Sequence, residues 1–230
     1  MTLRGKVPLL VAGRQIGWLS PALAARLAGW PQVFNVDQKA VSLLSHERLH
    51  AVVEKLAQEG FIPGWRNERY RIEDLFEVER AAARPFGFTT QAVHVNGIVP
   101  GAGMWMARRS LSKPTDPGLL DNLVGGGMTA GLSEMEVLVK EAWEEAGIQE
   151  ALARKAMRGG TARILREVAE GVQSEVVHVY DLELPAGFAP RNQDGEVSEF
   201  LLLPFERVLG HDLTLEARLA AQDYFSRTAG

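Results

Sequence analysis

Three glutamates, Glu141, Glu144 and Glu145, stand at positions i, i+3 and i+4 of one predicted helix. At about 100° per residue, this spacing brings their carboxylates to one patch of the helix surface. Like charges at this separation destabilise a helix unless a positive group offsets them. Lys140 could pair with Glu144 or Glu136, each four residues away, and Mg²⁺ or Mn²⁺ could be bound by the carboxylate oxygens. A solvated acidic helix face is the alternative interpretation of such a charge run.

The helix that positions these glutamates carries signals at both of its ends. Ser133 and Glu136 form an S-x-x-E capping box at the start, and Gly147 predicts a left-handed stop. The three glycines Gly125–Gly127 precede the helix and predict a tight backbone turn that can approach a ligand closely. The opposite arc of the helix is predicted to pack against the core through Met135, Leu138, Val139, Ala142, Trp143 and Ala146.

This combination of a glycine run and a carboxylate-bearing helix resembles the Nudix box, G-x5-E-x7-R-E-U-x-E-E-x-G-U, in which U is a bulky aliphatic residue. Gly126 matches the first glycine, and Gly147 with Ile148 matches the end of the box. The helix glutamates of the box are matched by Glu141, Glu144 and Glu145.

Three positions depart from the box. Leu132 stands where the box has its first glutamate, which removes one potential outer ligand. Lys140 replaces the arginine, which keeps the charge but loses the planar fork of donors. Ala142 is smaller than the usual aliphatic residue.

Short motifs along most of the chain resemble one Nudix subgroup, described as thiamine-pyrophosphokinase-related. In chain order, they are Trp65-Arg66-Asn67-Glu68, His94-Val95-Asn96-Gly97, Asp121-Asn122-Leu123-Val124-Gly125-Gly126-Gly127, Tyr180-Asp181-Leu182-Glu183-Leu184-Pro185 and Asp194-Gly195-Glu196-Val197. The resemblance implies an α/β fold, a Nudix α/β/α sandwich around a mixed sheet, preceded by a small α+β accessory domain. It also implies that bound Mg²⁺ or Mn²⁺ supports the hydrolysis of a diphosphate linkage.

The resemblance assigns roles to the acidic residues. It makes the three helix glutamates metal ligands, with the backbone carbonyl of Gly125 as a further ligand. In the family, a carboxylate from a loop after the helix often acts as another ligand or as the general base. Glu196 is our choice for this position, with Glu199 and Asp194 as alternatives, and an ordinary acidic turn as the competing interpretation.

Contacts with substrate are expected from polar residues outside the box, which are Arg66, Glu68, Asn96, Arg109 and Lys113. Arg108, Arg109 and Lys113 form a basic cluster that could bind phosphate or could guard the edge of a sheet with charge. His94 on a strand is expected to be structural.

The subgroup implies that thiamine diphosphate, or its oxidised analogues, is cleaved to a monophosphate and phosphate. Two other readings stay open. One is hydrolysis of a nucleoside diphosphate derivative, such as a dinucleotide, a sugar nucleotide or an oxidised nucleotide. The other is a ligand-sensing module that has kept the fold and lost turnover.

The pattern of the chain changes near residue 85. Residues 1–85 read as a small α+β unit, with a strand pair around Gly13, a helix that begins after Ser20 and a helix that Ser45 caps. Residues 86–230 read as the Nudix domain. In it, Ala92–Val99 and Met104–Arg109 alternate as a hairpin, and a closing helix is predicted from residue 213 to 225.

The composition fits a soluble globular protein of 230 residues, with 46% hydrophobic and 23% charged residues. A net charge of -4 without a basic run gives no reason to expect a nucleic acid partner. The absence of cysteine excludes disulfides and thiolate metal sites. The longest N-terminal apolar run, Val7–Ala12, is too short to span a membrane, and a cytoplasmic protein is expected. Nudix domains often pair, so a homodimer is one possible assembly.

Overall fold

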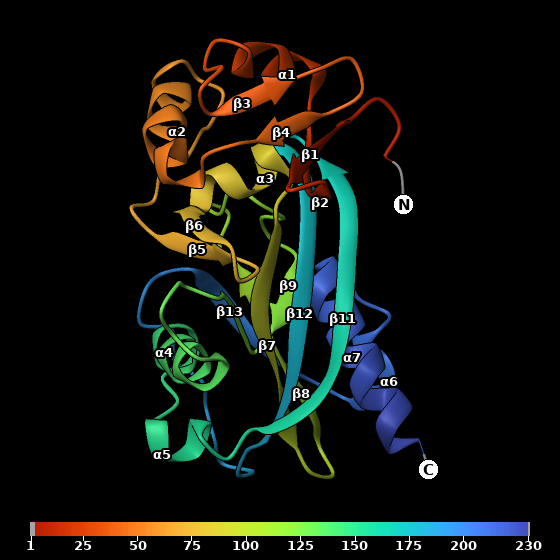
Figure 1. Cartoon of the computed structure of the whole chain (residues 1–230). Helices are drawn as coiled ribbons and strands as arrows, with labels where there is room; N and C mark the ends of the chain where they lie inside the picture. Colours follow the sequence, from red (N-terminus) through yellow and green to blue (C-terminus); the bar gives the residue numbers. More distant parts are fainter. Residues whose placement is uncertain (1–2, 230) are drawn as a thin grey trace. The chain divides into compact units, whose positions relative to one another are not determined.

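The computed structural model describes residues 3–229 and contains two compact units (Figure 1). Unit 1 comprises the chain up to Thr90 together with two later segments, Thr129–Gly131 and Ile164–Glu175. Unit 2 comprises Gln91–Met128, Leu132–Arg163 and the chain from Val176 onward. The boundary between residues 85 and 86 that the sequence suggests stays a proposal.

Unit 1 contains a four-stranded sheet with the strand order β2-β1-β4-β3 and a separate two-stranded sheet formed by β5 and β6. Its strands and helices are β1 (Val7–Val11), β2 (Arg14–Leu19), α1 (Pro21–Leu27), β3 (Phe34–Val36), β4 (Val41–Leu43), α2 (Leu49–Gln58), β5 (Arg69–Ile72), β6 (Phe76–Glu79) and α3 (Ala83–Phe86).

The first two helices of unit 1 begin differently. The predicted cap of α1 is confirmed, because the Ser20 hydroxyl accepts a hydrogen bond from the Leu23 N–H at 3.2 Å. The predicted cap of α2 is wrong. Ser45 makes no capping hydrogen bond, and a 3-10 turn, His46–Arg48, precedes the helix. Leu49, Val52, Val53 and Leu56 anchor α2 to the core through its apolar face, as its spacing predicts.

Unit 2 is built around the strand order β11-β12-β7-β8-β13, with β10 paired to β7 and β9 paired to β8. The strands are β7 (Thr89–Val99), β8 (Gly103–Arg109), β9 (Leu120–Asn122), β10 (Val124–Gly127), β11 (Met157–Val168), β12 (Gly171–Glu183) and β13 (Val197–Leu203). The predicted hairpin is confirmed, since β7 and β8 pair antiparallel from Gly97 opposite Trp105 to Val99 opposite Gly103.

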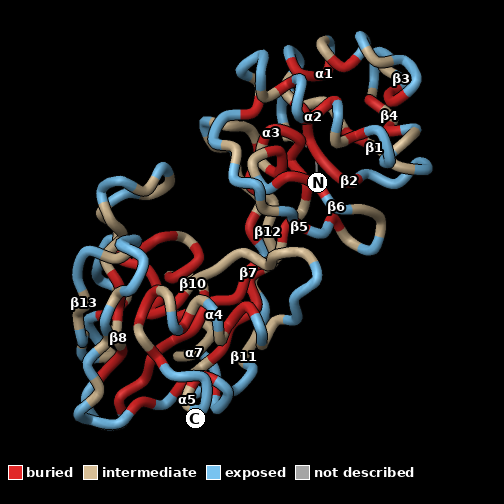
Figure 2. Tube along the Cα trace, turned by 90° about the vertical axis from the view of Figure 1, so that its left-hand side faces the viewer, coloured by how far each residue is buried: buried red, intermediate tan, exposed pale blue. Residues whose placement is uncertain are grey.

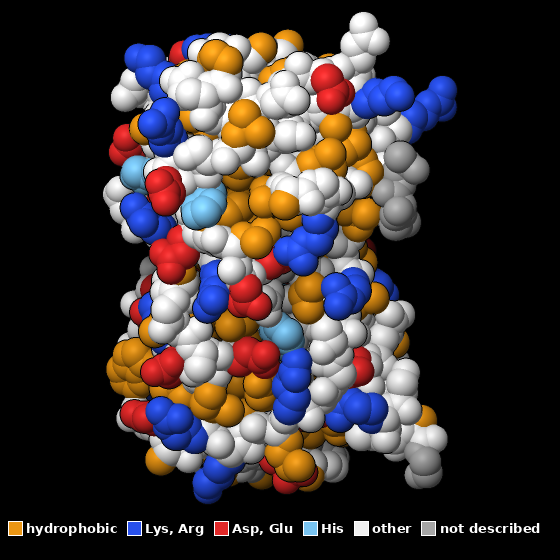
Figure 3. Space-filling view, in the orientation of Figure 1, with side chains coloured by type: hydrophobic (Ala, Val, Ile, Leu, Met, Phe, Trp, Pro, Cys, Tyr) orange, Lys and Arg blue, Asp and Glu red, His pale blue; other side chains and the backbone are white. Residues whose placement is uncertain are grey.

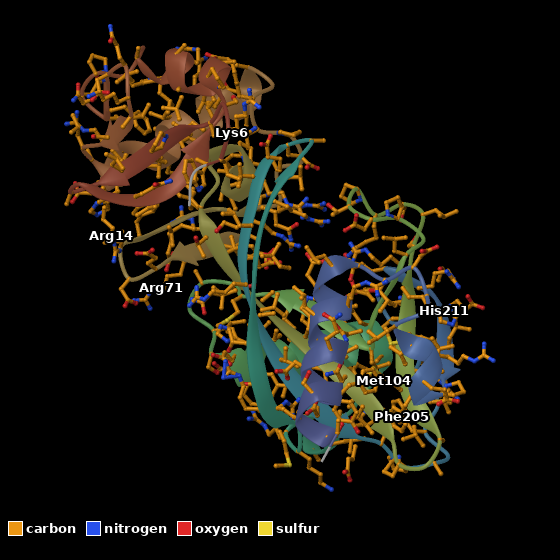
Figure 4. All side chains as sticks on the ribbon, turned by 90° about the vertical axis from the view of Figure 1, so that its right-hand side faces the viewer. Lys6, Arg14, Arg71, Met104, Phe205 and His211 are labelled. Carbon is orange, nitrogen blue, oxygen red and sulfur yellow. The ribbon has the colours of Figure 1, made fainter. Side chains whose placement is uncertain are left out.

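Helices cover both faces of this sheet (Figure 1). Helices α4 (Glu134–Ala146) and α5 (Glu150–Ala153) lie on one side, and α6 (Phe205–Val208) and α7 (Leu215–Thr228) lie on the other. Each side has its own apolar core, and Figure 2 shows the mostly buried trace of β7. Figure 4 labels Met104 and Phe205, which belong to the core beneath α7. The expected α/β/α sandwich is confirmed.

The strands β11 and β12 form a long hairpin of 12 and 13 residues (Figure 1). Its turn-side part, Ile164–Glu175, belongs to unit 1. There, Lys6, labelled in Figure 4, forms an ion pair with Glu167 at 3.2 Å, and Arg84 forms one with Glu170 at 3.7 Å. The Thr89 and Ser174 hydroxyls are 2.8 Å apart. Unit 1 therefore includes residues that lie far beyond the N-terminal third of the chain.

Basic and acidic side chains are intermixed on the face of the molecule in Figure 3. Among the helices of residues 3–229, none is both long enough and apolar enough to cross a membrane.

Candidate functional site

Helix α4 begins and ends where its sequence signals predict. The Ser133 hydroxyl accepts a hydrogen bond from the Glu136 N–H at 3.3 Å, and the Glu136 carboxylate accepts one from the Ser133 N–H at 2.8 Å. This reciprocal capping box satisfies two backbone donors of the first turn. Gly147 ends the helix with φ at 65°, a left-handed conformation that glycine adopts without a steric penalty. The carboxylate-bearing helix therefore has fixed ends.

The two faces of α4 differ from the prediction at three residues. One of them is Val137, which was expected on the acidic arc and is fully buried. Trp143, which we expected to pack, is 46% exposed, because its side chain lies outside the arc formed by Val137, Leu138, Ala142 and Ala146. Glu145, which we placed on the exposed acidic face, is 8% exposed. The buried arc therefore extends to one of the three glutamates, and this carboxylate is held inside the protein.

Burial raises the pKa of Glu145 to about 8. The Gly125 N–H donates to Glu145 Oε2 at 2.8 Å and opposes this rise, while the charges of Glu141 and Asp121 add to it. Lys113 lowers the pKa of Glu145, which is the smallest of these effects. Glu145 is therefore a buried carboxylate with two further carboxylates near enough to raise its pKa, an environment typical of functional sites.

The predicted tight turn at the glycines is wrong. Gly125–Gly127 lie in the strand β10, where Gly125 pairs with His94 and Gly126 with Val93 of β7. Glycine is needed here because of neighbouring side chains. A Cβ on Gly126 would lie 2.3 Å from Glu141 Cγ, and one on Gly125 would lie 2.9 Å from the His94 ring. The missing side chains let α4 and its carboxylates approach the strand closely.

Lys140 lies among the glutamates of α4. Its Nζ is 3.0 Å from Glu141 Oε1 and 2.8 Å from Glu144 Oε2. Contact with these two carboxylates raises the pKa of Lys140 above its ordinary value, although burial, the largest single influence, lowers it. The predicted pairing of Lys140 with Glu144 is present, and Glu141 shares it.

The carboxylates and the Gly125 carbonyl have the donor chemistry that Mg²⁺ and Mn²⁺ prefer. Within residues 3–229, no three His, Asp or Glu side chains are arranged to hold one metal ion. Lys140 bridges Glu141 and Glu144, and Glu145 faces a backbone N–H. The residue types fit a divalent cation, and these side chains would have to exchange their present partners to bind it. Leu132, just before the helix and 37% exposed, supplies no carboxylate.

Arg109 is held by a buried carboxylate, Asp121, that was not predicted as a site residue. Arg109 Nη1 donates to Asp121 Oδ2 at 2.9 Å, and Arg109 Nε donates to the Thr115 carbonyl at 3.1 Å. Asp121 Oδ1 accepts from the Thr214 hydroxyl at 3.1 Å. Asp121 is close enough to Glu145 to raise its pKa, so the structure brings Arg109 and α4 to one region.

The post-helix carboxylates have separate partners. Glu196 forms an ion pair with Lys113, and Lys113 also acts electrostatically on Glu145. Glu199 pairs instead with Arg108 at 2.7 Å. Asp194 accepts the Glu196 N–H at 2.8 Å and so shapes the turn. Of the three candidates, Glu196 is the one whose partner reaches the environment of Glu145.

Arg66 and Glu68 belong to unit 1. Arg66 is exposed, and its backbone N–H donates to Glu79 at 2.9 Å. Glu68 accepts a hydrogen bond from the Thr129 hydroxyl, and it forms an ion pair with Arg80 at 2.7 Å. The Ala130 N–H donates to the Arg69 carbonyl at 2.8 Å, and Thr129 forms an antiparallel bridge with Tyr70. The segment between the glycine strand and α4 is therefore bound to β5.

The expected substrate contact of Asn96 is not supported by its position. Asn96 is fully buried, donates to Asp181 at 2.9 Å and to the Ala220 carbonyl at 3.1 Å, and accepts from Asn122 at 2.8 Å. His94, whose Nδ1 lies 2.9 Å from Asn122 Oδ1, belongs to the same network. Asn96 joins strand β7 to α7, and its polar atoms are occupied.

Asp121 and Thr129 are the site neighbours that sequence reasoning missed. Asp121 stands in the short buried strand β9 beside Asn122, and a charged residue that is buried is usually paired. A charged residue within a short strand expected to be buried is a signal that could have marked Asp121 as a site residue. Thr129 has no such signal, because its partner Glu68 is 61 residues away in the chain.

Comparison with known families divides the chain in two. Residues 89–224 match the family described as the NUDIX domain, and residues 2–90 match one described as a domain of unknown function, DUF4743. The chain is 37% identical over 221 residues to Nudix hydrolase 24, chloroplastic, of Arabidopsis thaliana, covering 88% of this chain and 60% of that protein. It is 45% identical over 166 residues to Nudix hydrolase 20, chloroplastic, of the same plant, covering 68% and 44%.

The fold also matches solved structures. The crystal structure of DR0079 from Deinococcus radiodurans superposes with a TM-score of 0.51 at 21% identity, covering 68% of this chain and 98% of that one. At this identity the likeness concerns the fold alone. The chain spans 60% and 44% of the two plant relatives, so their whole-protein activities are not transferred to it directly.

Proposed function

Because the chain belongs to the Nudix family, we propose that it is a pyrophosphohydrolase that cleaves a diphosphate linkage in a small molecule with the help of divalent cations. The observation that carries this proposal is the buried Glu145 beside Glu141 and Glu144. A carboxylate with a pKa of about 8, beside two further carboxylates, is an arrangement in which a bound cation relieves repulsion.

Nudix hydrolases generally use divalent metal ions, and the choice of Mg²⁺ or Mn²⁺ is part of the proposal. Glu141, Glu144, Glu145 and the Gly125 carbonyl would hold the ion. When bound, such an ion neutralises diphosphate charge and lowers the pKa of a coordinated water.

The chain's own basic residues would bind and orient the phosphates. Arg109 is fixed by Asp121 and by the Thr115 carbonyl, so its guanidinium loses little freedom when an anion binds. Lys113 presents an ammonium group next to Glu196. We assign phosphate binding to both residues. Their ion pairs with Asp121 and Glu196 also show that each cation sits beside a carboxylate before substrate arrives.

Glu196 is the proposed general base. In the reaction a water molecule attacks phosphorus, one P–O bond of the diphosphate breaks, and the proton of the water passes to a carboxylate. Glu196 is half-exposed and forms an ion pair with Lys113, whose ammonium group can exchange the carboxylate for a phosphate. Glu199 and Asp194 remain the alternatives, and their pairing with Arg108 and the Glu196 N–H makes them less available.

Two classes of substrate follow from two levels of relationship. The family as a whole implies a nucleoside diphosphate-linked substrate. The narrower resemblance of the sequence motifs implies thiamine diphosphate or its oxidised analogues. The names of the relatives give no support to the thiamine prediction, and the subgroup assignment stays a prediction with it.

Assembly and location also stay predictions. A homodimer is untested, and the expected cytoplasmic location is not confirmed, since both plant relatives are named as chloroplastic proteins.

Product analysis tests the proposed function. The panel contains thiamine diphosphate, its oxo and oxy analogues, an oxidised nucleoside triphosphate, NADH and ADP-ribose, each with Mg²⁺ and with Mn²⁺. Glu144→Gln serves as the blank, and Glu150→Gln, on the short helix α5 and paired with Arg154, serves as the matched control. We expect metal-dependent cleavage of one class by the wild type and the control. Folded, metal-binding protein that turns over no member of the panel would favour the ligand-sensing reading instead.

A further inference from the structure

A cavity of about 700 Å³ is lined by residues of unit 1 alone. Helix α2 contributes to its lining, and the other lining residues are Trp65, Asn67, Arg69 and Glu79. Cavities that bind small molecules commonly enclose about 300–1,000 Å³. Residues 2–90 match a family described as a domain of unknown function, and that description assigns no ligand to them.

The cavity has an aromatic wall that is held in place. The Trp65 Nε1–H donates to Asn67 Oδ1 at 2.8 Å, which fixes the plane of the indole. Asn67 makes this contact with φ at 58°, a left-handed conformation that asparagine tolerates better than most residues. The His50 ring lies 6.1 Å from the indole at 51°. A fixed indole of this kind offers a stacking surface to a planar ligand.

A buried carboxylate reaches the same cavity. Glu79 is 2% exposed, and its Oε1 accepts the Arg66 N–H at 2.9 Å and the Ala81 N–H at 3.2 Å. Across residues 3–229, no hydrogen bond to Glu79 Oε2 is found. Since Oε1 takes both backbone donors, Oε2 is the oxygen of Glu79 that can accept an N–H from a ligand.

A guanidinium stands next to this carboxylate. Arg69 lies directly opposite Glu79 in the β5–β6 pair, and both line the cavity. In the described part of the chain, the Arg69 side chain has no ion pair, whereas Arg71 on the same strand pairs with Asp74 and Arg80 pairs with Glu68. Arg69 can therefore donate to an anionic group of a ligand.

We propose that this cavity binds a planar heterocycle that carries an exocyclic amino group and a phosphate. The heterocycle stacks on Trp65, its amino group donates to Glu79 Oε2, and its phosphate accepts hydrogen bonds from Arg69. The proposal concerns a site of unit 1 and does not depend on the hydrolytic activity of unit 2.

Calorimetric titration of the full chain with AMP, in the presence of EDTA, tests the proposal. EDTA removes the cations on which diphosphate binding at α4 depends, so failure here is separate from failure of the proposed hydrolysis. We expect saturable binding of one AMP per chain. Purine riboside 5′-monophosphate, which lacks only the amino group, should bind about tenfold more weakly, as one lost hydrogen bond predicts.

Variants identify the cavity as the site. Trp65→Ala and Glu79→Gln should each weaken AMP binding at least about tenfold. Glu79→Gln keeps the acceptor for both backbone N–H groups and should not distinguish AMP from purine riboside 5′-monophosphate. Arg69→Gln should weaken AMP but leave adenosine binding unchanged. Arg71, labelled in Figure 4, lies on the same strand, so Arg71→Gln is the matched control. This variant should bind AMP as tightly as the wild type does.

CMP and thiamine monophosphate are the further probes, since each carries an amino-substituted heterocycle and a phosphate. The proposal is supported if AMP, CMP or thiamine monophosphate binds and if that binding depends on Trp65 and Glu79. Absence of binding by all three would overturn it, as would binding that both variants leave unchanged. Should Trp65→Ala fail to fold, Trp65→Phe keeps an aromatic ring and releases it from Asn67, and weaker binding is again expected.

Discussion

Glu145 in unit 2 and Glu79 in unit 1 are both buried glutamates that accept backbone N–H groups, yet their surroundings differ. Glu145 has one such donor, Gly125, and two carboxylates close by, Glu141 and Asp121. Glu79 has two donors on one oxygen, and its cross-strand neighbour is the cationic Arg69. The first environment contains further carboxylates, and the second contains a cation.

This difference shows that burial of a carboxylate does not by itself indicate what it binds. Neighbouring charges decide between a multivalent cation, which relieves repulsion among several carboxylates, and a neutral donor, which satisfies one oxygen. A metal should therefore affect unit 2 through α4, and a heterocycle should affect unit 1 through Trp65. Four variants test this distinction.

Glu144→Gln should have the largest effect, because it removes a proposed metal ligand from a surface where the fold does not need it. We expect turnover to fall more than about 100-fold, with an unchanged melting temperature and unchanged AMP binding in EDTA. Steady-state kinetics measure the turnover, thermal melts measure the melting temperature, and calorimetric titration measures AMP binding. Wild-type rates in this variant would contradict the assignment of α4 as the metal helix.

Gly126→Ala should disturb α4 from the strand side. The added Cβ would lie 2.3 Å from Glu141 Cγ, so Glu141 or the strand must move, at a cost of about 1–3 kcal/mol. We expect a lower melting temperature and roughly tenfold less activity. Gly187→Ala, where the Cβ meets no atom within 4 Å, is the control and should change neither.

Glu145→Gln should change how stability depends on pH. Burial raises the pKa of Glu145 from 4.5 to about 8, so the metal-free fold loses stability as the pH rises between these values. The wild type in EDTA should melt at least about 3 °C lower at pH 8.5 than at pH 5, and the variant should show a smaller decline. Saturating Mg²⁺ should reduce the decline in the wild type. A parallel pH dependence in the two proteins would contradict this account of Glu145.

Thr129→Val should have the smallest effect. It removes the hydroxyl that donates to Glu68 and keeps the side-chain shape, and Glu68 retains its ion pair with Arg80. We expect a loss of about 1–2 kcal/mol of stability and a change in kcat of less than about tenfold. Thr129→Ser, which keeps the hydroxyl, is the control. Equal stability and equal kcat of Thr129→Val and Thr129→Ser would mean that the hydrogen bond to Glu68 contributes to neither quantity.

Local signals predicted much of the fold. The capping box of Ser133 and Glu136, the stop at Gly147 and the β7–β8 hairpin depend on residues close together in the chain, and all three are confirmed. The sandwich was predicted from the resemblance carried by the same residues. Such features are accessible from sequence because propensity and hydrophobic period act within a few residues.

The errors arose where distant parts of the chain decide the outcome. Gly125–Gly127 are required by side chains from α4 and β7, and nothing in the local sequence distinguishes this requirement from that of a turn. Asn96 contacts partners from 26 to 124 residues away, so its polar side chain on a strand gave no sign that it was fully occupied. Glu79 pairs across a hairpin that the sequence analysis did not predict.

The long β11–β12 hairpin has a consequence for the order in which the chain can fold during its synthesis. Ile164–Glu175 supplies unit 1 with Glu167 for Lys6 and Glu170 for Arg84. A ribosome that adds about 5–20 residues per second must therefore make most of the protein before these partners exist. The N-terminal 90 residues, although they match a family of their own, would wait for a segment translated much later, which links the maturation of the two units in time.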